Sequence, residues 1–431
     1  MSLEDSVSEF PYVEEFRGGK KFAFMLCWDD GNYDLEFSLM EDEIGIKHTS
    51  FVVTSRVYDK VLWGLDMLFR GHDIQSHSQV HLNHKSLENS YQEYLLEQSK
   101  LDIKSLFGYS PILFAYPYGA SDSYLRSHVL DYYRVARGIV FEKDKEIGQW
   151  PIQILENAKH TFPDADGLTG ENLHELLPSF GQMIANYEKK SLAYKAYGHT
   201  KSFTDEQITD LRTALSTIAN RTDTWITTWG EAVAYQIQRD SSNIYDYRMG
   251  EDFVSFNIRV PEQDNFGIPL TYRIEIPEQW EYFTVLDGGK ISDRFSFHND
   301  AKGRYILLDA VPNNQRITVE AFSYHDTLKP IIRNLRTIVT TEGVAFLADV
   351  SDAGSLISNV NITVSGNGSI YEFTNVRNPL FWSNSTYGRV LFGIIKGCYQ
   401  FKVTARDASG NIVVLAYNFN LEPTHRLDMP S

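Results

Sequence analysis

The first half of this 431-residue chain alternates short β-rich runs with stretches long enough for helices, and this alternation most constrains the fold. Thr204 and Gln207 form a capping-box pattern that opens one helix, and Leu211 and Leu215 then fall on one of its faces. So many strand–helix units predict a parallel sheet that closes, or nearly closes, into a (β/α) barrel. Strands are predicted at 22–28, 49–53, 73–76, 112–116, 133–136, 192–197 and 225–228.

In the second half of the chain, apolar residues recur at every second position. Val254, Phe256, Ile258 and Val260 alternate with polar residues, and a proline ends the run. The same alternation returns at 270–276, 360–364 and 399–403. The segment 402–411 resembles the last hairpin of bacterial Ig-like modules. The chain is therefore predicted to be an α/β barrel at 1–240, a β-sandwich module at 241–326 and an Ig-like β-sandwich module at 327–431.

The charge and hydropathy of the chain argue against a nucleic acid partner and against a membrane-spanning segment. Forty Lys and Arg against 57 Asp and Glu give a net charge of −17, so the averaged field repels phosphate backbones, and no nucleic acid partner is expected. No apolar stretch of about 18 residues exists, so no membrane span is predicted. The first twenty residues lack the basic start and apolar centre of a secretory signal. The oligomeric state cannot be predicted.

Two neighbouring carboxylates follow the first predicted strand. Asp29 and Asp30 precede Gly31, a pattern that also occurs in turns whose carboxylates are solvated. His77 and His81 follow the third strand, and their spacing of four puts both imidazoles on one side of a helical turn, where one tetrahedral metal can bridge them. Alternatively, the histidines decorate a polar surface loop.

The position of these residues along the strands favours a common site. In a (β/α) barrel the carboxyl ends of the strands share one rim, so residues that follow different strands can converge. Pro117, Tyr118 and His199 also follow predicted strands. One carboxylate and two imidazoles form a three-ligand site that leaves a fourth position for water, as in catalytic zinc centres. Zinc lowers the pKa of such a water to about 7.

Four motifs in this order carry a family resemblance: Trp28-Asp29-Asp30-Gly31, then His77-Ser78-Gln79-Val80-His81, then Phe114-Ala115-Tyr116-Pro117-Tyr118-Gly119, then Tyr197-Gly198-His199. Over about residues 20–235 the chain resembles the NodB-type polysaccharide deacetylases, carbohydrate esterase family 4. The resemblance implies a distorted (β/α) TIM-like barrel. It also implies a metal-dependent hydrolase that removes N-acetyl, sometimes O-acetyl, groups from sugars.

The resemblance also implies a role for each matching residue. Asp30, His77 and His81 would bind a divalent metal, for which zinc is the expected ion. Asp29 would be the general base that deprotonates the attacking water, and His199 the acid that protonates the leaving amine. The main-chain N–H of Tyr118 would hold the oxyanion. Pro117 and Tyr197 would line the pocket.

Two positions depart from the family pattern. Ala115 stands where many members have an arginine that orients the base aspartate, and Tyr197 stands where a leucine commonly helps to form the acetyl pocket. Arg137, just past the fifth predicted strand, could reach the same rim and replace that arginine. It could equally be a structural or surface arginine.

The sequence therefore predicts a metal-dependent deacetylase whose partner is an acetylated glycan. Two alternatives remain: a hydrolase of a small linear or cyclic amide on the same barrel, and a catalytically silent glycan-binding protein. A glycan substrate and Ig-like modules favour a location outside the cytoplasm, whereas the first twenty residues, which lack the features of a secretory signal, do not, so the compartment stays open.

Overall fold

The computed structural model describes residues 11–138, 147–148, 193–201, 203–280, 282–322, 326–376, 378–379, 385–394 and 396–421. Within this part of the chain, residues 15–68 and 72–240 form one compact unit, and residues of 1–14, 69–71 and 241–431 form the other. None of the described helices is long and apolar enough to cross a bilayer.

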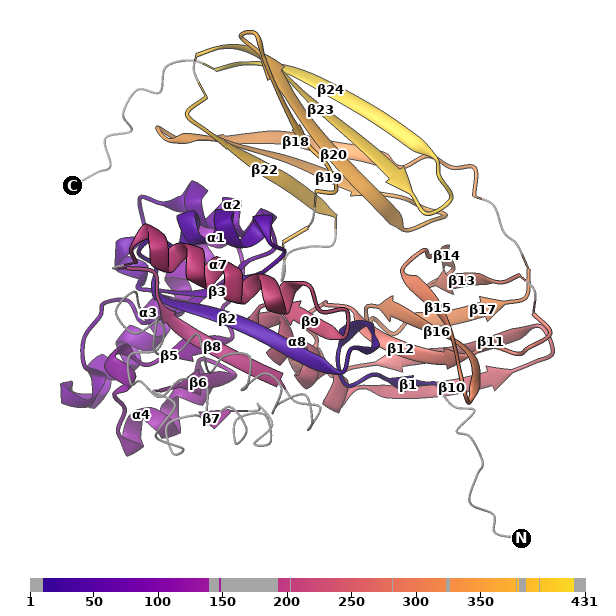
Figure 1. Cartoon of the computed structure of the whole chain (residues 1–431), viewed down its shortest axis with the longest axis horizontal. Helices are drawn as coiled ribbons and strands as arrows, with labels where there is room; N and C mark the ends of the chain where they lie inside the picture. The colour runs from indigo at the N-terminus through magenta and orange to yellow at the C-terminus, as the bar shows by residue number, and fades with distance from the viewer. Residues whose placement is uncertain are drawn as a thin grey trace. The chain divides into compact units, whose positions relative to one another are not determined.

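The first unit is built on a mainly parallel sheet with helices packed on it (Figure 1). The strand order is β7-β6-β5-β4-β3-β2-β8, and β9 pairs with β2. Its strands are β2 (Phe22–Asp30), β3 (His48–Val52), β4 (Asp73–Ser76), β5 (Leu113–Ala115), β6 (Val135–Arg137), β7 (Ile147–Gly148), β8 (Ala193–His199) and β9 (Thr224–Thr227). Its helices are α1 (Asp34–Glu43), α2 (Val61–Phe69), α3 (Asn89–Phe107), α4 (Ser123–His128), α7 (Asp205–Ala219) and α8 (Trp229–Ser241). Among the described strands of this unit, only β7 runs antiparallel to its neighbour.

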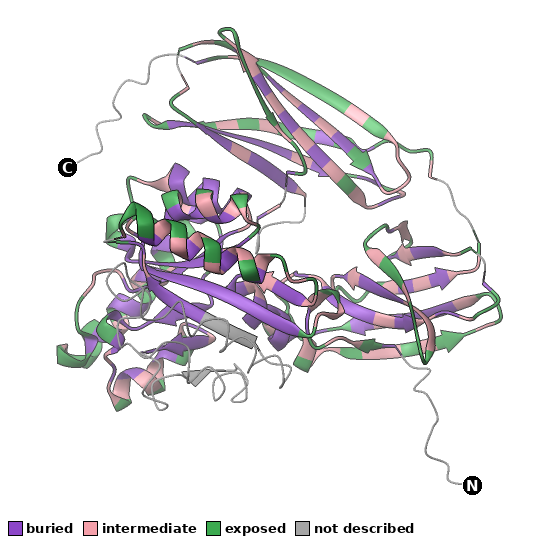
Figure 2. Cartoon of the chain, in the orientation of Figure 1, coloured by how far each residue is buried: buried purple, intermediate pink, exposed green. Residues whose placement is uncertain are grey.

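Strand β2 pairs with three other strands of this sheet, β3, β8 and β9. All nine of its residues are buried, as Figure 2 shows, because helices cover the sheet. Trp28 of β2 packs against Phe37 of α1 and belongs to one apolar cluster with Leu211 and Leu215 of α7. The predicted capping box at the start of α7 is present. This packing fixes the carboxyl end of β2, where the two aspartates lie.

The second unit consists of antiparallel strands in four sheets. Its first module has the sheets β1-β12-β16-β15 and β10-β11-β17-β13-β14. The strands are β1 (Tyr12–Val13), β10 (Asn243–Met249), β11 (Phe253–Arg259), β12 (Leu270–Glu275), β13 (Thr284–Asp287), β14 (Lys290–Ile291), β15 (Phe295–Asp300), β16 (Gly303–Ala310) and β17 (Arg316–Glu320). Strand β1 pairs with β12, so the chain contributes a strand to this module before it enters the barrel.

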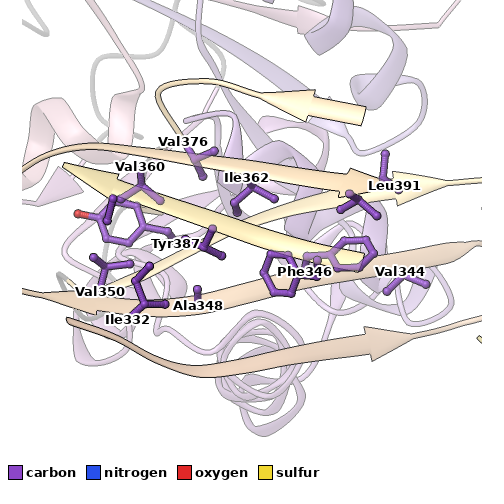
Figure 3. Close-up of a cluster of buried hydrophobic side chains, with 14 of the residues drawn as sticks. Ile332, Val344, Phe346, Ala348, Val350, Val360, Ile362, Val376, Tyr387 and Leu391 are labelled. Carbon is purple, nitrogen blue, oxygen red and sulfur yellow. The ribbon is translucent and has the colours of Figure 1, made fainter. Parts of the chain in front are cut away.

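The last module has the sheets β18-β19-β22 and β21-β20-β23-β24. Its strands are β18 (Ile331–Val339), β19 (Gly343–Ser351), β20 (Ile357–Gly366), β21 (Ser369–Phe373), β22 (Thr386–Phe392), β23 (Gly397–Asp407) and β24 (Ile412–Leu421). Figure 3 shows that Val344 and Phe346 of β19 and Val360 and Ile362 of β20 meet in one core. The alternating apolar residues of each strand supply this core.

The predicted fold class is confirmed: a parallel strand–helix sheet of the distorted barrel type precedes all-β modules. Each of the seven predicted barrel strands is present, with ends shifted by up to two residues. The domain limits and the Ig-like kinship of the last module stay predictions.

Candidate metal centre

The predicted site residues lie at the carboxyl ends of neighbouring parallel strands. Asp29 and Asp30 are the last residues of β2, His77 follows β4, and Arg137 and His199 end β6 and β8. Asp29 and His199 are directly opposite each other in the register of β2 and β8. The parallel arrangement therefore brings residues from distant parts of the sequence to one rim.

Asp30 is the centre of this group. Its Oδ1 lies 3.3 Å from Nε2 of His81 and 3.7 Å from Nε2 of His77. The residue has a left-handed backbone, with φ of 78°, which non-glycine residues adopt only where the surroundings hold it. Oδ1 is buried and accepts no hydrogen bond. A buried carboxylate oxygen without a donor is costly, so this atom requires a partner.

The hydrogen bonding of His77 defines which nitrogen faces Asp30. Its Nδ1 lies 2.9 Å from the main-chain oxygen of Ala115, and because a carbonyl can only accept, Nδ1 carries the proton. The lone pair of Nε2 therefore points toward Asp30. Burial lowers the pKa of His77 to about 4 and also lowers the pKa of His81, which keeps both imidazoles neutral at pH 7.

The arrangement fits a divalent metal. Burial raises the pKa of Asp30, but the basic groups around it, Arg56 among them, together outweigh this effect, so the pKa lies below its usual value and the carboxylate is charged at pH 7. One charged oxygen and two neutral imidazoles are the donor set of catalytic zinc. Ligands of a tetrahedral zinc at about 2.1 Å are roughly 3.4 Å apart, close to the separations observed here. Asp30, His77 and His81 could thus hold one ion among them.

Asp29 forms a buried ion pair with Arg137. Burial lowers the pKa of Arg137, but the groups around it, Asp29 foremost, together raise it by more, so the guanidinium remains charged. The guanidinium lies 4.7 Å from the ring centre of Phe51 and 4.8 Å from that of Tyr197, and these rings hold it in place. Arg137 is opposite Ala115 in the register of β5 and β6. It approaches Asp29 from the strand next to Ala115.

The remaining predicted residues surround the same rim. Pro117 is buried, whereas the side chain of Tyr118 is 61% exposed and its ring lies 4.4 Å from that of His81. Tyr118 has φ of 60°, which turns the backbone after β5 sharply. Tyr197 is buried with its ring on Arg137, and Nδ1 of His199 is buried without a hydrogen bond.

A polar network fastens the end of β8 to the start of α1. Thr200 donates to Oδ1 of Asp34 at 2.8 Å and accepts from the main-chain N–H of Tyr33 at 3.0 Å. Burial raises the pKa of Asp34 to about 6. Because Thr200 follows His199 directly, this network limits the positions that the imidazole can take.

Two cations near Asp30 were missed by the sequence analysis. Arg56 Nη1 lies 3.6 Å from Asp30 Oδ1, and Lys201 Nζ lies 3.7 Å from Oδ2. Both side chains are about half exposed, at 46% and 53%. The available signal was positional: Arg56 comes shortly after β3 and Lys201 shortly after β8, at the same rim as the predicted ligands.

A second group of possible ligands in the barrel, Glu41, His48 and His72, does not fit a metal. Nδ1 of His72 accepts from the main-chain N–H of His48 at 3.1 Å, and Nε2 lies 3.2 Å from Asp42. Both ring nitrogens of His72 therefore already have polar partners. The carboxylate of Glu41 accepts a hydrogen bond from Trp28 and bonds to the ring of His48. This group is a buried hydrogen-bond network of the core.

The sequence and the fold were compared with known proteins. Residues 17–133 match the family model described as polysaccharide deacetylase. A gellan lyase from a Bacillus species is 25% identical over 323 residues, which make up 70% of this chain and 13% of that protein. Among solved structures, the peptidoglycan deacetylase PdaC from Bacillus subtilis is 16% identical, covering 53% of this chain and 96% of that chain, with a TM-score of 0.35. Puue allantoinase is 12% identical, covering 54% and 96%, with a TM-score of 0.39.

The family match confirms the resemblance drawn from the sequence motifs. It begins before β2 and ends before β6, so it includes Asp29, Asp30, His77, His81, Pro117 and Tyr118. The match therefore covers the first half of the barrel, from the segment before β2 to the segment before β6.

Proposed function

We propose that this chain, whose residues 17–133 match the polysaccharide deacetylase family model, is a metal-dependent hydrolase of N-acetyl or O-acetyl groups on an acetylated glycan. The observation that carries the proposal is the buried Oδ1 of Asp30, which accepts no hydrogen bond and faces Nε2 of both His77 and His81. A divalent cation between these three atoms would satisfy the carboxylate and both lone pairs.

Asp30, His77 and His81 would hold the metal, with zinc as the expected ion. When bound, the ion would lower the pKa of a water and polarise the acetyl carbonyl. Asp29 would accept the proton of the attacking water. Arg137 would hold the Asp29 carboxylate in place through their buried ion pair, so that its second oxygen stays available.

The leaving group requires a separate acid. Attack of water on the acetyl carbon breaks the C–N bond only if the amine nitrogen gains a proton, and His199, opposite Asp29 on the next strand, is positioned to supply it. The main-chain N–H of Tyr118 would stabilise the negative charge on the acetyl oxygen. Pro117 and Tyr197 would border the acetyl group. Acetate and a free amine are the products.

Metal content is the first test. The chain is incubated with zinc, dialysed and analysed by mass spectrometry beside Asp30→Ala, His77→Ala and the control His298→Ala, which changes a histidine of the β unit. We expect one equivalent in the wild type and in the control, and loss of metal in both site variants with unchanged circular dichroism. A folded wild type without bound metal would contradict the mechanism.

Activity is the second test. Release of acetate from acetylated oligosaccharides, absent in Asp30→Ala, would support the proposed reaction. Turnover of small amides but not of acetylated oligosaccharides would indicate that the protein is a hydrolase of small amides. Binding of glycans without acetate release would indicate a silent glycan-binding protein.

A further inference from the structure

The last β module contains a group of three carboxylates far from the barrel in sequence. Asp352 follows β19 directly, Asp407 is the last residue of β23, and Asp326 precedes β18. One oxygen of each carboxylate lies within 4.8 Å of one oxygen of each of the others. Two of these residues are almost entirely buried: Asp352 is 6% exposed and Asp407 is 1% exposed.

The hydrogen-bond donors to the carboxylates of Asp352 and Asp407 in the described part of the chain are neutral. Asp352 Oδ1 accepts from the main-chain N–H groups of Gly354 and Ser355, both at 2.8 Å. Asp407 accepts from the main chain of Asn411 at 2.8 Å and from its side chain at 2.9 Å. Ser355 Oγ donates to Asp326 Oδ2 at 2.8 Å. These bonds orient the carboxylates but do not neutralise them.

The second oxygen of Asp352 has no donor. Oδ2 is buried and accepts no hydrogen bond. Within the described part of the chain, neither Asp352 nor Asp407 forms an ion pair with a basic side chain. The amine of Lys290 donates at 2.6 Å to the main-chain oxygen of Asp352, not to its carboxylate. Buried carboxylates without a cation are strongly unfavourable, so Asp352 and Asp407 would gain most from a bound positive ion.

Gly354 gives the cluster its shape. A Cβ built on this residue would lie 2.5 Å from Cγ and Oδ1 of Asp326 and 2.6 Å from its Oδ2. The Asp326 carboxylate thus occupies the space that any side chain at position 354 would fill. This close approach holds the third carboxylate against the loop that carries Asp352.

We propose that Asp326, Asp352 and Asp407 bind a calcium ion at the start of the last β module. Three carboxylates without imidazole or thiolate ligands favour a hard cation that takes oxygen ligands, and the irregular, partly open arrangement suits calcium better than the strict octahedron of magnesium. The ion would link the segment that enters the module to the ends of β19 and β23. It would therefore stabilise this module without any part in the barrel chemistry.

The test uses the full chain, freed of divalent ions by chelation and titrated calorimetrically with calcium chloride. The variants are Asp352→Asn and Asp407→Asn, with Asp252→Asn, an exposed aspartate of the same unit, as the control. We expect one calcium per chain in the wild type and the control, with Kd in the range of about 10⁻⁵ to 10⁻³ M. Each cluster variant should weaken binding at least about tenfold.

Two further measurements separate this site from the Asp30 centre and from misfolding. Asp30→Ala should retain calcium binding in full. Gly354→Ala leaves every carboxylate in the sequence but displaces that of Asp326, so it should also weaken calcium binding. Millimolar calcium should raise the thermal midpoint of the wild type and leave that of Asp352→Asn unchanged.

The absence of calcium binding to the folded wild type at millimolar concentrations would overturn the proposal. Binding that persists unchanged in both Asp352→Asn and Asp407→Asn would do the same. If the folded wild type binds no calcium, the three carboxylates would have to be held together by shared protons and not by a metal ion.

Discussion

The guanidinium of Arg137 pairs with the carboxylate of Asp29, although 108 residues separate them in the sequence. The pair is buried, and the guanidinium lies over the rings of Phe51 and Tyr197. Because Ala115 occupies the same register on the adjacent strand, an arginine from β6 can serve a carboxylate on β2. Arg137 on β6 thus places its positive charge at the same rim as an arginine at position 115 on β5 would.

Arg137→Met should reduce kcat about 100-fold with a smaller change in KM, because Asp29 loses the partner that orients it. It should also destabilise the fold by about 3 kcal/mol, since it leaves a buried carboxylate unpaired. Steady-state acetate release and urea unfolding measure the two effects. Arg137→Lys keeps the charge without the fork of donors and should fall between wild type and Arg137→Met. Full activity in a folded Arg137→Met variant would show that the arginine is only structural.

His199→Gln distinguishes an acid catalyst from a residue that merely shapes the rim. An amide needs a proton on its leaving nitrogen, whereas an activated aryl acetate leaves without one. We expect His199→Gln to lower kcat on an N-acetyl substrate about 100-fold or more but to affect hydrolysis of the aryl ester much less. Equal losses on both substrates, measured with the metal content held constant, would contradict the assigned role.

Arg56 and Lys201 add positive charge beside the metal ligands. We therefore expect acidic acetylated oligosaccharides to give higher kcat/KM than neutral ones of the same length, with a preference that weakens as salt is added. The double variant Arg56→Gln/Lys201→Gln should lose most of this preference while its kcat on neutral substrates changes little. A matched double change of exposed basic residues in the β unit, Arg248→Gln/Lys302→Gln, is the control. The same preference in wild type and double variant would exclude a role for these cations in substrate selection.

The sequence revealed the barrel strands because each is a short β-rich run between helical patterns, and the rim residues because parallel strands end together. The partner of Asp29 could be anticipated for the same reason. Arg56 and Lys201 also follow strands that end at this rim, but that position alone does not distinguish an arginine or lysine in a loop from a solvated surface charge. Their proximity to Asp30 depends on the paths of two loops.

Two features of the β unit could not be predicted for a different reason. Strand β1 has only two residues, too few for a period, and its pairing with β12 joins parts of the chain more than 250 residues apart. The carboxylates of the calcium site lie at the ends of separate strands, with no fixed spacing. Long-range pairing of this kind is set by the tertiary fold and leaves no local pattern.

His84 should make stability depend on pH. Its Nε2 bonds Ser78 Oγ at 2.8 Å, and burial lowers its pKa to about 4. Because the unfolded chain binds the proton more tightly, His84 destabilises the fold as pH falls from about 6.5 to about 4, by up to about 3 kcal/mol. Asp34 and Asp73, whose pKa values burial raises to about 6, act in the opposite direction over the same range.

The contribution of His84 is therefore measured as a difference between wild type and His84→Gln. Urea unfolding at pH 7 and pH 4 should show that the variant loses less stability on acidification than the wild type does. Identical losses in the two proteins would mean that His84 titrates alike in the folded and unfolded chains.

Gly64 of α2 packs so closely on α3 that a methyl group has no space. A Cβ there would lie 2.2 Å from Phe107 Cε1 and 3.0 Å from Ile74 Cδ1, and Phe107 is buried. Gly64→Ala should therefore destabilise the barrel by about 1–3 kcal/mol, even though alanine favours a helix over glycine by about 1 kcal/mol. The double variant Gly64→Ala/Phe107→Leu removes the obstructing ring, so its loss of stability should be smaller than the sum of the two single losses. If the double variant instead loses as much stability in urea unfolding as the two single variants together, the added methyl group does not clash with Phe107.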